Sequence, residues 1–265
     1  MCEVKLVENL VYDIEIGRDG QFDLYVPQVV QGKKVPLLIY FHGGGLESGD
    51  KADDRNMYTE LAGLGILVAS ANYRMYPQVG FPVFIEDAAH AVAGILKQIK
   101  TYADYGQTWI GGISAGGYLS MMLHFEPAFL AKHGVEENSI TGYIFDAGQP
   151  TVHFNVLRER GLDTGAVRVD EAAPIYYLTE PYEANLQQHF LVLTAENDIP
   201  GRPEQTELLI KTMLTHGYEK EQITYKVMPG FGHAAYVWTK DEQGSYPYAK
   251  LLGDYINGKQ EEYTK

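Results

Sequence analysis

The chain has 265 residues, and its 45% apolar and 12% aromatic content is typical of a folded globular protein. Its 35 acidic and 21 basic side chains give a formal net charge of −14, which argues against nucleic acid or an anionic membrane surface as a partner. The one cysteine, Cys2, excludes an internal disulfide and a thiolate-rich metal site.

Alternating apolar residues predict antiparallel strands in the first part of the chain, at Val4–Ile16 and Phe22–Val26, with a hairpin turn at Arg18–Gly20. Two continuous apolar runs follow, Pro36–Phe41 and Ile66–Ala71. Continuous runs of this length are typical of strands that are buried on both faces of a sheet. The sequence therefore predicts buried central strands with antiparallel strands beside them.

The remainder of the chain alternates between helices and strands. Apolar residues three and four positions apart predict a helix over Ile85–Tyr102. Similar patterns predict further elements, namely strands at Thr108–Ile113, Ile140–Phe145, Phe190–Leu193 and Ile223–Met228, and helices at Tyr118–Phe125, Glu204–His216 and Tyr246–Ile256. Such alternation indicates βαβ units, and hence one α/β domain over residues 1–265 with a mostly parallel sheet and helices on both faces.

Residues 149–189 interrupt this alternation. Proline, tyrosine and charged residues dominate there, and about 40 residues without a clean pattern are too many for a simple connection. We predict a small insertion that serves as a cap or pocket wall. Its tyrosines, Tyr176, Tyr177 and Tyr182, have two interpretations: they stack on a sugar or aryl substrate, or, as is more common, they pack the insertion on the sheet.

The G-x-S-x-G sequence at residues 112–116 carries the strongest chemical signal. It follows a predicted strand and precedes a predicted helix, the context in which this pattern forms a sharp turn that exposes the serine at the carboxyl edge of a sheet. The two glycines remove Cβ atoms where strand and helix pass closely. The pattern indicates Ser114 as a nucleophile; the alternative is a serine that only caps the helix.

A glycine-rich loop, HGGG at residues 42–45, follows a predicted buried strand. The backbone N–H groups of Gly44 and Gly45, together with that of Ala115, are candidates to surround a developing oxyanion. The alternatives are a flexible turn or a phosphate-binding loop, but no G-K-[ST] follows the glycines. His42 belongs to this loop, and we expect it to orient the loop rather than to act in catalysis.

A serine hydroxyl needs a base to take its proton, and the base needs an acid to orient it. Among the eight histidines, His233 follows the last predicted strand and therefore lies at the same edge of the sheet as the serine. Asp198 follows the preceding strand, which produces the chain order serine, acid, histidine. Glu196 stays open as a competing acid, while Asp146 and Asp170 are weaker candidates.

Four motifs in this order resemble those of a known family. FHGGG at 41–45, GISAG at 112–116, AENDIP at 195–200 and GFGHA at 230–234 are similar to motifs of the α/β-hydrolase esterases of the hormone-sensitive-lipase and BD-FAE-like groups. The resemblance implies the α/β-hydrolase fold with a small insertion or cap. Matched residue by residue, it implies these roles: nucleophile Ser114, acid Asp198, base His233, and oxyanion donors Gly44, Gly45 and Ala115.

The motifs together predict a serine carboxylic-ester hydrolase that forms an acyl-enzyme and needs no cofactor or metal. We expect small-molecule esters with short acyl groups as substrates, acetylated carbohydrates first. The alternatives are a small amidase, arylformamidase or peptidase on the same fold, and a non-catalytic binding protein. Residues 1–5 lead into no long apolar run, and no window approaches about 18 apolar residues, so we expect a cytoplasmic protein that binds no membrane. A homo-oligomer stays open.

Overall fold

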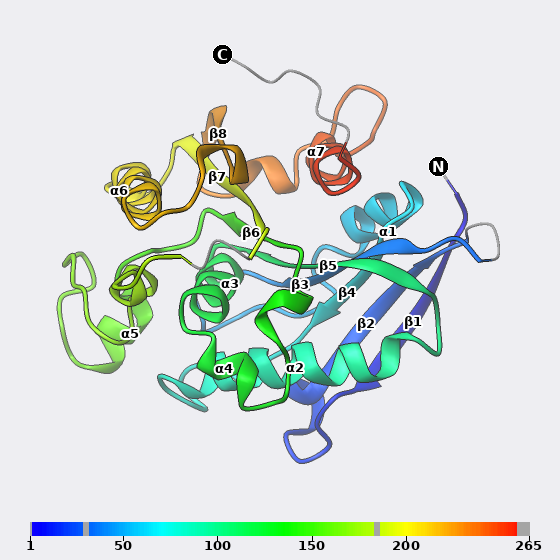
Figure 1. Ribbon diagram of the computed structural model, residues 1–265, viewed down its shortest axis with the longest axis horizontal. Coiled ribbons are helices and arrows are strands. Elements are labelled where there is room, and N and C mark those ends of the chain that lie inside the picture. Colours follow the sequence, from blue (N-terminus) through cyan, green and yellow to red (C-terminus); the bar gives the residue numbers. More distant parts are fainter. Residues whose placement is uncertain (1, 29–31, 183–185, 259–265) are drawn as a thin grey trace.

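The computed structural model describes residues 2–28, 32–182 and 186–258. In these ranges eight strands form one sheet, in the spatial order β1-β2-β4-β3-β5-β6-β7-β8 (Figure 1). Their bounds are β1 Val4–Val11, β2 Gln21–Pro27, β3 Val35–Phe41, β4 Leu67–Ala71, β5 Tyr105–Ile113, β6 Gly142–Asp146, β7 His189–Asn197 and β8 Ile223–Gly232. β2 pairs antiparallel with both β1 and β4, and the other strand pairs are parallel. The predicted mostly parallel sheet with antiparallel N-terminal strands is confirmed.

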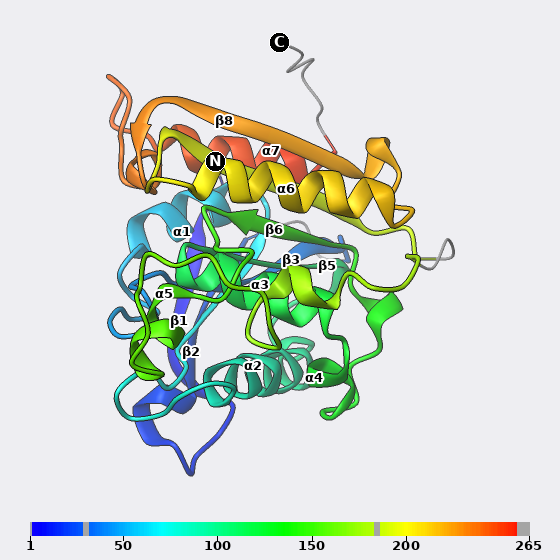
Figure 2. The same ribbon diagram turned by 90° about the vertical axis from the view of Figure 1, so that its left-hand side faces the viewer.

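Helices cover both faces of the sheet (Figure 1). One face carries α2 (Val83–Ile99), α3 (Ala115–Phe125) and α6 (Arg202–Thr215), and the other carries α1 (Arg55–Gly63) and α7 (Pro247–Ile256). Figure 2 shows α6 and α7 on opposite sides of β8. Two short helices, α4 (Ala128–Ala131) and α5 (Phe154–Glu159), pack in the same core as α2 and α3.

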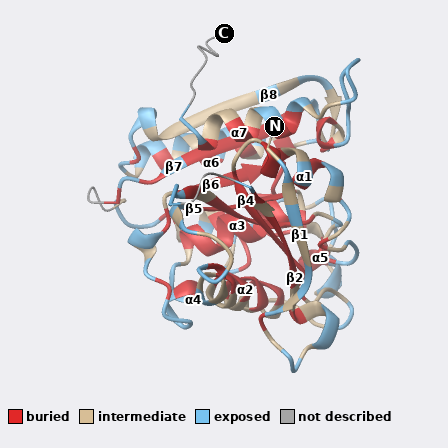
Figure 3. Ribbon diagram, turned by 90° about the vertical axis from the view of Figure 1, so that its right-hand side faces the viewer, coloured by how far each residue is buried: buried red, intermediate tan, exposed pale blue. Residues whose placement is uncertain are grey.

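Strand β3 explains why the central strands are continuous apolar runs in the sequence. Leu37, Ile39 and Phe41 join the core on the α2 and α3 face. Leu38 and Tyr40 join the core on the α1 and α7 face. Because successive side chains point to opposite faces, a strand covered on both faces needs an apolar residue at nearly every position. The central strands are accordingly the most buried part of the molecule (Figure 3).

Strand β1 is shorter than predicted, because the chain leaves the sheet after Val11 and not after Ile16. Tyr12 turns inward at this point. Its hydroxyl lies 2.8 Å from the carbonyl oxygen of Asp19 and 2.9 Å from that of Asn72. These two backbone acceptors hold the chain in a loop where the apolar alternation alone predicts a continuing strand.

Helix α1 is not predicted by the sequence pattern. Its segment is mostly polar, and its buried side chains, Met57, Tyr58, Leu61 and Ala62, form a single stripe. Nine residues make too few turns for this periodicity to stand out from the flanking loops. The helix nevertheless packs on β1, β2 and β4 and beside α7, so it belongs to the second helix layer.

Among the described residues between β6 and β7, the chain forms only α5 and a 3-10 turn at Pro174–Tyr177. Tyr182 stacks on Tyr218 with 4.0 Å between ring centroids, and its hydroxyl donates to the Leu186 carbonyl at 2.7 Å. The packing interpretation is therefore confirmed for this tyrosine. No helix in the part of the chain that the structure describes is both long enough and apolar enough to cross a membrane.

Candidate active site

Ser114 lies at the sharp turn between β5 and α3. Its backbone has φ 56° and ψ −108°, a region that non-glycine residues rarely adopt. An ideal Cβ on Gly112 would lie 2.4 Å from the carbonyl carbon of Gly116, and one on Gly116 would lie 2.0 Å from the carbonyl oxygen of Phe41. Only glycine fits at these two positions, so strand and helix approach closely and leave the serine exposed to the carboxyl edge.

His233 connects Ser114 to Asp198. The Ser114 hydroxyl donates to His233 Nε2 across 2.8 Å, and His233 Nδ1 donates to Asp198 Oδ1 across 2.6 Å. The carboxylate is fully buried, whereas the imidazole is 25% exposed, so a substrate can reach the ring but not the acid. The structure thus brings the three predicted residues together in the arrangement of nucleophile, base and orienting acid. Their catalytic roles stay a prediction.

Strands β7 and β8 determine where the acid and the base lie. Both strands run past their predicted ends, and the last pair in their ladder joins Asn197 to Gly232. Asp198 and His233 are therefore the first residues after the ladder on two neighbouring strands. This common origin explains why two side chains 35 positions apart in the sequence meet at hydrogen-bond distance.

The Asp198 carboxyl is held in its charged form. Burial alone would raise its pKa, but the hydrogen bond and charge of His233 and the N–H groups of Ile199 and Ala195 outweigh burial and lower the pKa below its usual value. Ile199 N lies 2.7 Å from Oδ1, and Ala195 N lies 3.2 Å from Oδ2. A charged carboxylate keeps the imidazole proton on Nδ1 and leaves Nε2 free to accept from the serine.

Two of the competing acids have other partners. Glu196 accepts a hydrogen bond from the backbone N–H of Gly230 at 2.7 Å and so ties β7 to β8. Asp170 forms an ion pair with Arg160 at 2.8 Å, within the segment that follows β6. The geometry therefore favours Asp198 over both.

Asp146, the third competitor, ends β6 and is buried beside the turn at Ser114. Its carbonyl oxygen accepts from Ser114 N at 2.8 Å. Its carboxylate accepts hydrogen bonds from the hydroxyls of Tyr236 and, at 2.5 Å, of Tyr248. Burial raises the pKa of this carboxyl to about 7, although the two tyrosine hydrogen bonds oppose the rise. Because Tyr236 follows His233 by three residues, Asp146 links the nucleophile turn to the histidine segment.

The glycine loop lies against the nucleophile turn. An ideal Cβ on Gly43 would be 3.5 Å from the Ser114 Cβ. Gly44 and Gly45 have φ values of 104° and 67°, and a Cβ on Gly44 would lie 1.9 Å from a backbone oxygen, so this position accepts only glycine. Within the described ranges, the N–H groups of Gly44, Gly45 and Ala115 donate to no other protein group. They therefore remain available as oxyanion donors, a role that stays a prediction.

His42 anchors this loop. Its buried ring stacks on Tyr73 with 4.6 Å between centroids, and its Nδ1 donates to the Gly43 carbonyl at 2.8 Å. The Tyr73 hydroxyl in turn donates to the His42 carbonyl at 3.0 Å. Burial lowers the pKa of His42, so the ring stays neutral. These contacts are those of a residue that orients the loop.

A cavity of about 680 Å³ adjoins Ser114. Besides the residues predicted from motifs, the cavity is lined by side chains that the sequence does not single out, including Glu47, Asp53, Asp54, Phe154 and Trp238. Glu47, Asp53 and Asp54 follow the glycine loop within nine residues and Trp238 follows the histidine by five, whereas Phe154 lies far from both in the sequence. A single sequence gives no signal for which neighbours of a motif face the substrate. Among the described residues, no group of three or more His, Cys, Asp or Glu side chains is placed to hold a metal ion.

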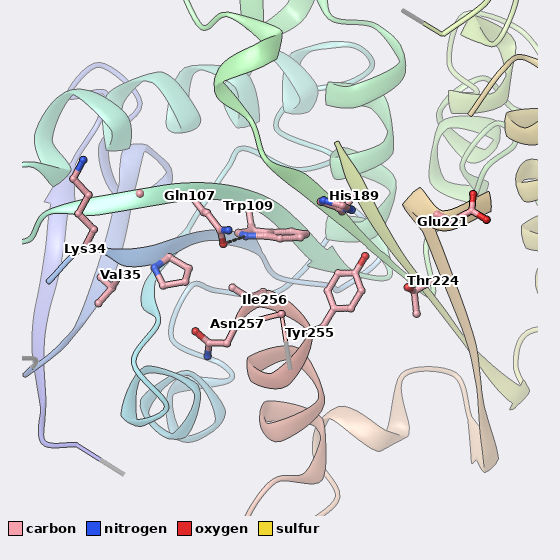
Figure 4. Close-up of a pocket in the computed structure, with 13 residues that line it drawn as sticks. Lys34, Val35, Gln107, Trp109, His189, Glu221, Thr224, Tyr255, Ile256 and Asn257 are labelled. Atoms are coloured by element: carbon pink, nitrogen blue, oxygen red, sulfur yellow. Dashed lines mark hydrogen bonds between the residues drawn. The ribbon is translucent and has the colours of Figure 1, made fainter. Parts of the chain in front are cut away.

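A second cavity, of about 450 Å³, lies at the opposite edge of the sheet, at the amino ends of the parallel strands (Figure 4). Trp109, His189 and Tyr255 line it, with 5.6 Å between the Trp109 and Tyr255 ring centroids. Trp109 precedes Ser114 by five residues, so about 16 Å of strand β5 separates the two cavities at about 3.3 Å per residue. None of the predicted site residues is among those that line this cavity.

The sheet, its helix layers and the linked Ser114, His233 and Asp198 define an α/β-hydrolase. Residues 22–154, just over half of the chain, match the family model of BD-FAE. The chain belongs to the BD-FAE family.

Curated relatives share one part of the chain. Tuliposide A-converting enzyme 2 of Tulipa gesneriana is 35% identical over 130 residues, which cover 44% of this chain and 34% of that protein. Esterase LipI of Mycobacterium tuberculosis is 30% identical over 119 residues, which cover 44% of this chain and 37% of that protein. The chain therefore spans only about a third of the length of the curated relatives that it matches.

Solved structures resemble nearly the whole chain. Esterase B from Lactobacillus Rhamnosis (HN001) has a TM-score of 0.76 at 18% identity, with 97% of this chain and 87% of that chain covered. A truncated carbohydrate esterase from gut microbiota has a TM-score of 0.72 at 18% identity, with 96% and 95% covered. At these identities the likeness concerns the fold alone, and it confirms the predicted α/β-hydrolase fold.

Proposed function

We propose that this protein is a serine carboxylic-ester hydrolase, with Ser114 as nucleophile, His233 as base and Asp198 as the acid that orients the base. The hydrogen-bonded chain from the Ser114 hydroxyl through the imidazole to the buried carboxylate supports this proposal most directly, at 2.8 and 2.6 Å. The names of several similar proteins, which are esterases, favour ester over amide substrates.

In the acylation step, Ser114 Oγ attacks the ester carbonyl carbon while its proton passes to His233 Nε2. The carbonyl oxygen becomes an oxyanion and accepts hydrogen bonds from the N–H groups of Gly44, Gly45 and Ala115. When the tetrahedral intermediate collapses, the C=O bond re-forms and the bond to the alcohol oxygen breaks. That oxygen takes the proton from Nε2, the alcohol leaves, and an acyl-serine remains.

In the deacylation step, water attacks the acyl carbon and passes its proton to His233 Nε2. Collapse of the second intermediate releases the carboxylic acid, and the Ser114 oxygen regains its proton from Nε2. Asp198 stays ionised throughout and stabilises the imidazolium, a role that matches its lowered pKa. The cycle uses only groups of the chain and water.

The acyl group that fits this site is short, and we propose an acetylated carbohydrate as the first substrate class to test. Phe154 restricts the space beside the glycine loop, because an ideal Cβ on Gly45 would lie 2.9 Å from the tip of its ring. The carbohydrate part of the proposal draws support from the carbohydrate esterase that shares the fold.

The first test is Ser114→Ala, assayed with p-nitrophenyl acetate. We expect turnover to fall by about 10⁴-fold or more, because neither His233 nor Asp198 can replace the serine as the nucleophile that attacks the carbonyl. Ser120→Ala is the matched control, since it removes the buried hydroxyl of a serine on helix α3 that donates to the Gly116 carbonyl at 2.9 Å. Its rate should stay near that of the unmodified protein. Turnover that survives in Ser114→Ala would overturn the nucleophile assignment.

Two further measurements separate the alternatives. A fluorophosphonate probe should label Ser114 in the native protein; no labelling would favour a non-catalytic binding protein. Matched acetyl esters and acetyl amides should show much faster ester turnover, and the reverse preference would favour an amidase. Within the esters, acetyl and butyryl groups should be hydrolysed faster than octanoyl groups.

A further inference from the structure

Trp238 lies in the same cavity as Ser114 and is unusually exposed for its size. Its surface is 59% exposed, yet its Nε1–H donates to Asp54 Oδ1 at 2.6 Å. Asp54 itself is only 6% exposed. A buried acceptor that holds an exposed indole fixes the orientation of the ring, so the protein keeps a flat apolar surface in water at a position where a substrate can reach it.

The indole belongs to the chain segment that follows the predicted base, His233. Trp238 follows His233 by five residues, through the 3-10 turn Ala235–Val237. Tyr236 in this turn is hydrogen-bonded to the buried Asp146, which holds the segment in place. In ester hydrolysis the base passes its proton to the alcohol oxygen. The alcohol portion of the substrate therefore extends towards the histidine segment and the indole.

The carboxylate side chains that line this cavity give it an acidic wall. They are Glu47, Asp53 and Asp54, and none of the described residues that line this cavity is a lysine or arginine. Glu47 Oε2 accepts from the Asn155 amide and forms an ion pair with Arg158, and Asp53 Oδ2 accepts from the backbone N–H of Asp50. Their other carboxylate oxygens, Glu47 Oε1 and Asp53 Oδ1, make no hydrogen bond among the described residues. Such oxygens accept hydroxyl protons well and repel anionic groups.

From this juxtaposition we propose that Trp238, held by Asp54, is the platform on which the sugar ring of the leaving alcohol stacks, while Glu47 and Asp53 accept its hydroxyl protons. The proposal rests on the proposed ester hydrolysis. A neutral sugar offers an apolar face of C–H groups to the indole, hydroxyl donors to the carboxylates and no negative charge. An aryl alcohol would use the indole but leave the carboxylates without donors, and a sugar phosphate would be repelled.

Three esters with the same acetyl group test the platform: a mono-O-acetylated methyl β-xyloside, phenyl acetate and ethyl acetate. In Trp238→Ala we expect kcat/KM for the acetylated xyloside to fall about tenfold, mainly through KM, because stacking on an aromatic face contributes binding. Ethyl acetate, whose alcohol is too small to span the cavity, should change less than about twofold. Trp238→Phe, which keeps an aromatic face, should retain most of the activity on the xyloside.

Each deviation has a defined meaning. An equal loss on the xyloside and on ethyl acetate would assign Trp238 a purely structural role and overturn the platform. A loss on phenyl acetate without a loss on the xyloside would assign the indole to aryl alcohols and overturn the sugar assignment. Unchanged kinetics on the xyloside would also overturn it.

A binding measurement separates the platform from the hydrolytic activity. The chain has two tryptophans, and Trp109 is 3% exposed, so an added sugar should change the fluorescence of Trp238 alone. Methyl β-xyloside titrated into Ser114→Ala should quench and shift the emission, and the same titration into Ser114→Ala with Trp238→Phe should not. A sugar-dependent signal in a protein without esterase activity would refute the proposed function and leave the platform standing. An active esterase that shows no signal would overturn the platform alone.

Discussion

The cavities at the two edges of the sheet contain similar residue types. The carboxyl-edge cavity holds Trp238 and His233, and the amino-edge cavity holds Trp109 and His189. In the first, the histidine is bonded to a serine and an aspartate, whereas in the second the histidine ring packs 6.4 Å from the indole. Both edges therefore have an aromatic lining, but only at the carboxyl edge is the histidine hydrogen-bonded to a serine and an aspartate.

Backbone conformation distinguishes the two edges further. Of the five described non-glycine residues with positive φ, four lie in the turns at the carboxyl edge: Leu46, Ser114, Ala147 and Ala234. Such conformations cost of order 1–3 kcal/mol each and persist only where the surrounding structure holds them. The strained non-glycine turns therefore gather at the edge of the sheet where Ser114, His233 and Asp198 meet.

The two histidines provide the sharpest test of this difference. His233→Gln should lower kcat/KM for p-nitrophenyl acetate by about 10⁴-fold or more, because the serine loses its base. His189→Gln, at the other edge, should leave kcat/KM near the unmodified value. Comparable losses in both variants would mean that the amino edge contributes to turnover, and the contrast between the edges would fail.

The glycines give a second matched pair. Gly44→Ala should lower kcat by about 10²- to 10³-fold, since a Cβ there would lie 1.9 Å from a backbone oxygen and would displace an oxyanion donor. Gly106→Ala at the amino edge should be tolerated, because its Cβ would lie 3.6 Å from the nearest atom, an ordinary contact. Steady-state kinetics on both variants, with circular dichroism for the fold, check this expectation. A fully active Gly44→Ala would remove Gly44 from the oxyanion site.

For the two tryptophans, substitution at the amino edge should have the larger effect when stability, and not turnover, is measured. Trp109→Ala should lower the free energy of unfolding by about 3–5 kcal/mol, because it empties a buried site, while kcat of the folded protein stays unchanged. Trp238→Ala should cost less than about 1 kcal/mol, since the indole is 59% exposed. Urea unfolding measures both. A larger loss in Trp238→Ala would make the exposed indole part of the folding core.

The buried Asp146 carboxyl at the carboxyl edge should lower the free energy of unfolding at neutral pH. Its pKa is raised from 3.8 to about 7, so between these values the folded protein binds more protons than the unfolded chain. This contribution to stability is complete below about pH 4 and is lost as the pH rises to about 7. Asp146→Asn cannot titrate and so lacks this pH-dependent loss. Relative to the unmodified protein, its free energy of unfolding should therefore rise by up to about 1.4 kcal/mol per pH unit through this range.

Urea unfolding at pH 5 and pH 8 measures this difference. The buried His42 and His124 have lowered pKa values and act in the opposite direction, but they are present in both proteins and cancel in the comparison. A difference in stability that is the same at both pH values would show that Asp146 titrates as an ordinary carboxyl.

The predictable parts of the site come from contiguous motifs or from strand ends. The turn at Ser114 and the loop at Gly44 are each marked by a few consecutive residues, and close contacts within and between these two segments require the glycines Gly44, Gly112 and Gly116. Asp198 and His233 could be predicted because the carboxyl ends of parallel strands meet at one edge. Sequence reasoning left Glu196 open because it stands only two residues from Asp198, and the side-chain directions separate the two.

The remaining features depend on contacts between distant residues. The hydrogen bond of Trp238 to Asp54 joins positions 184 apart in the sequence and belongs to no motif. The end of β1 depends on Tyr12 finding acceptors at Asp19 and Asn72, the latter 60 positions away. Apolar alternation in a single sequence carries no record of such partners, so both features first become visible in the folded chain.

The pairing of Asn197 with Gly232 also determines where the chain tolerates insertions. Because this pairing sets the distance between Asp198 and His233, the connection between β7 and β8 can lengthen without moving either side chain. The exposed turn at Gly217 is such a place, and a foreign peptide spliced in there should leave turnover intact. A single residue inserted within β8 would shift the register by one and turn His233 towards the opposite face. Only a few residues thus separate the turn at Gly217, which should accept an inserted peptide, from strand β8, which should not tolerate a change of length.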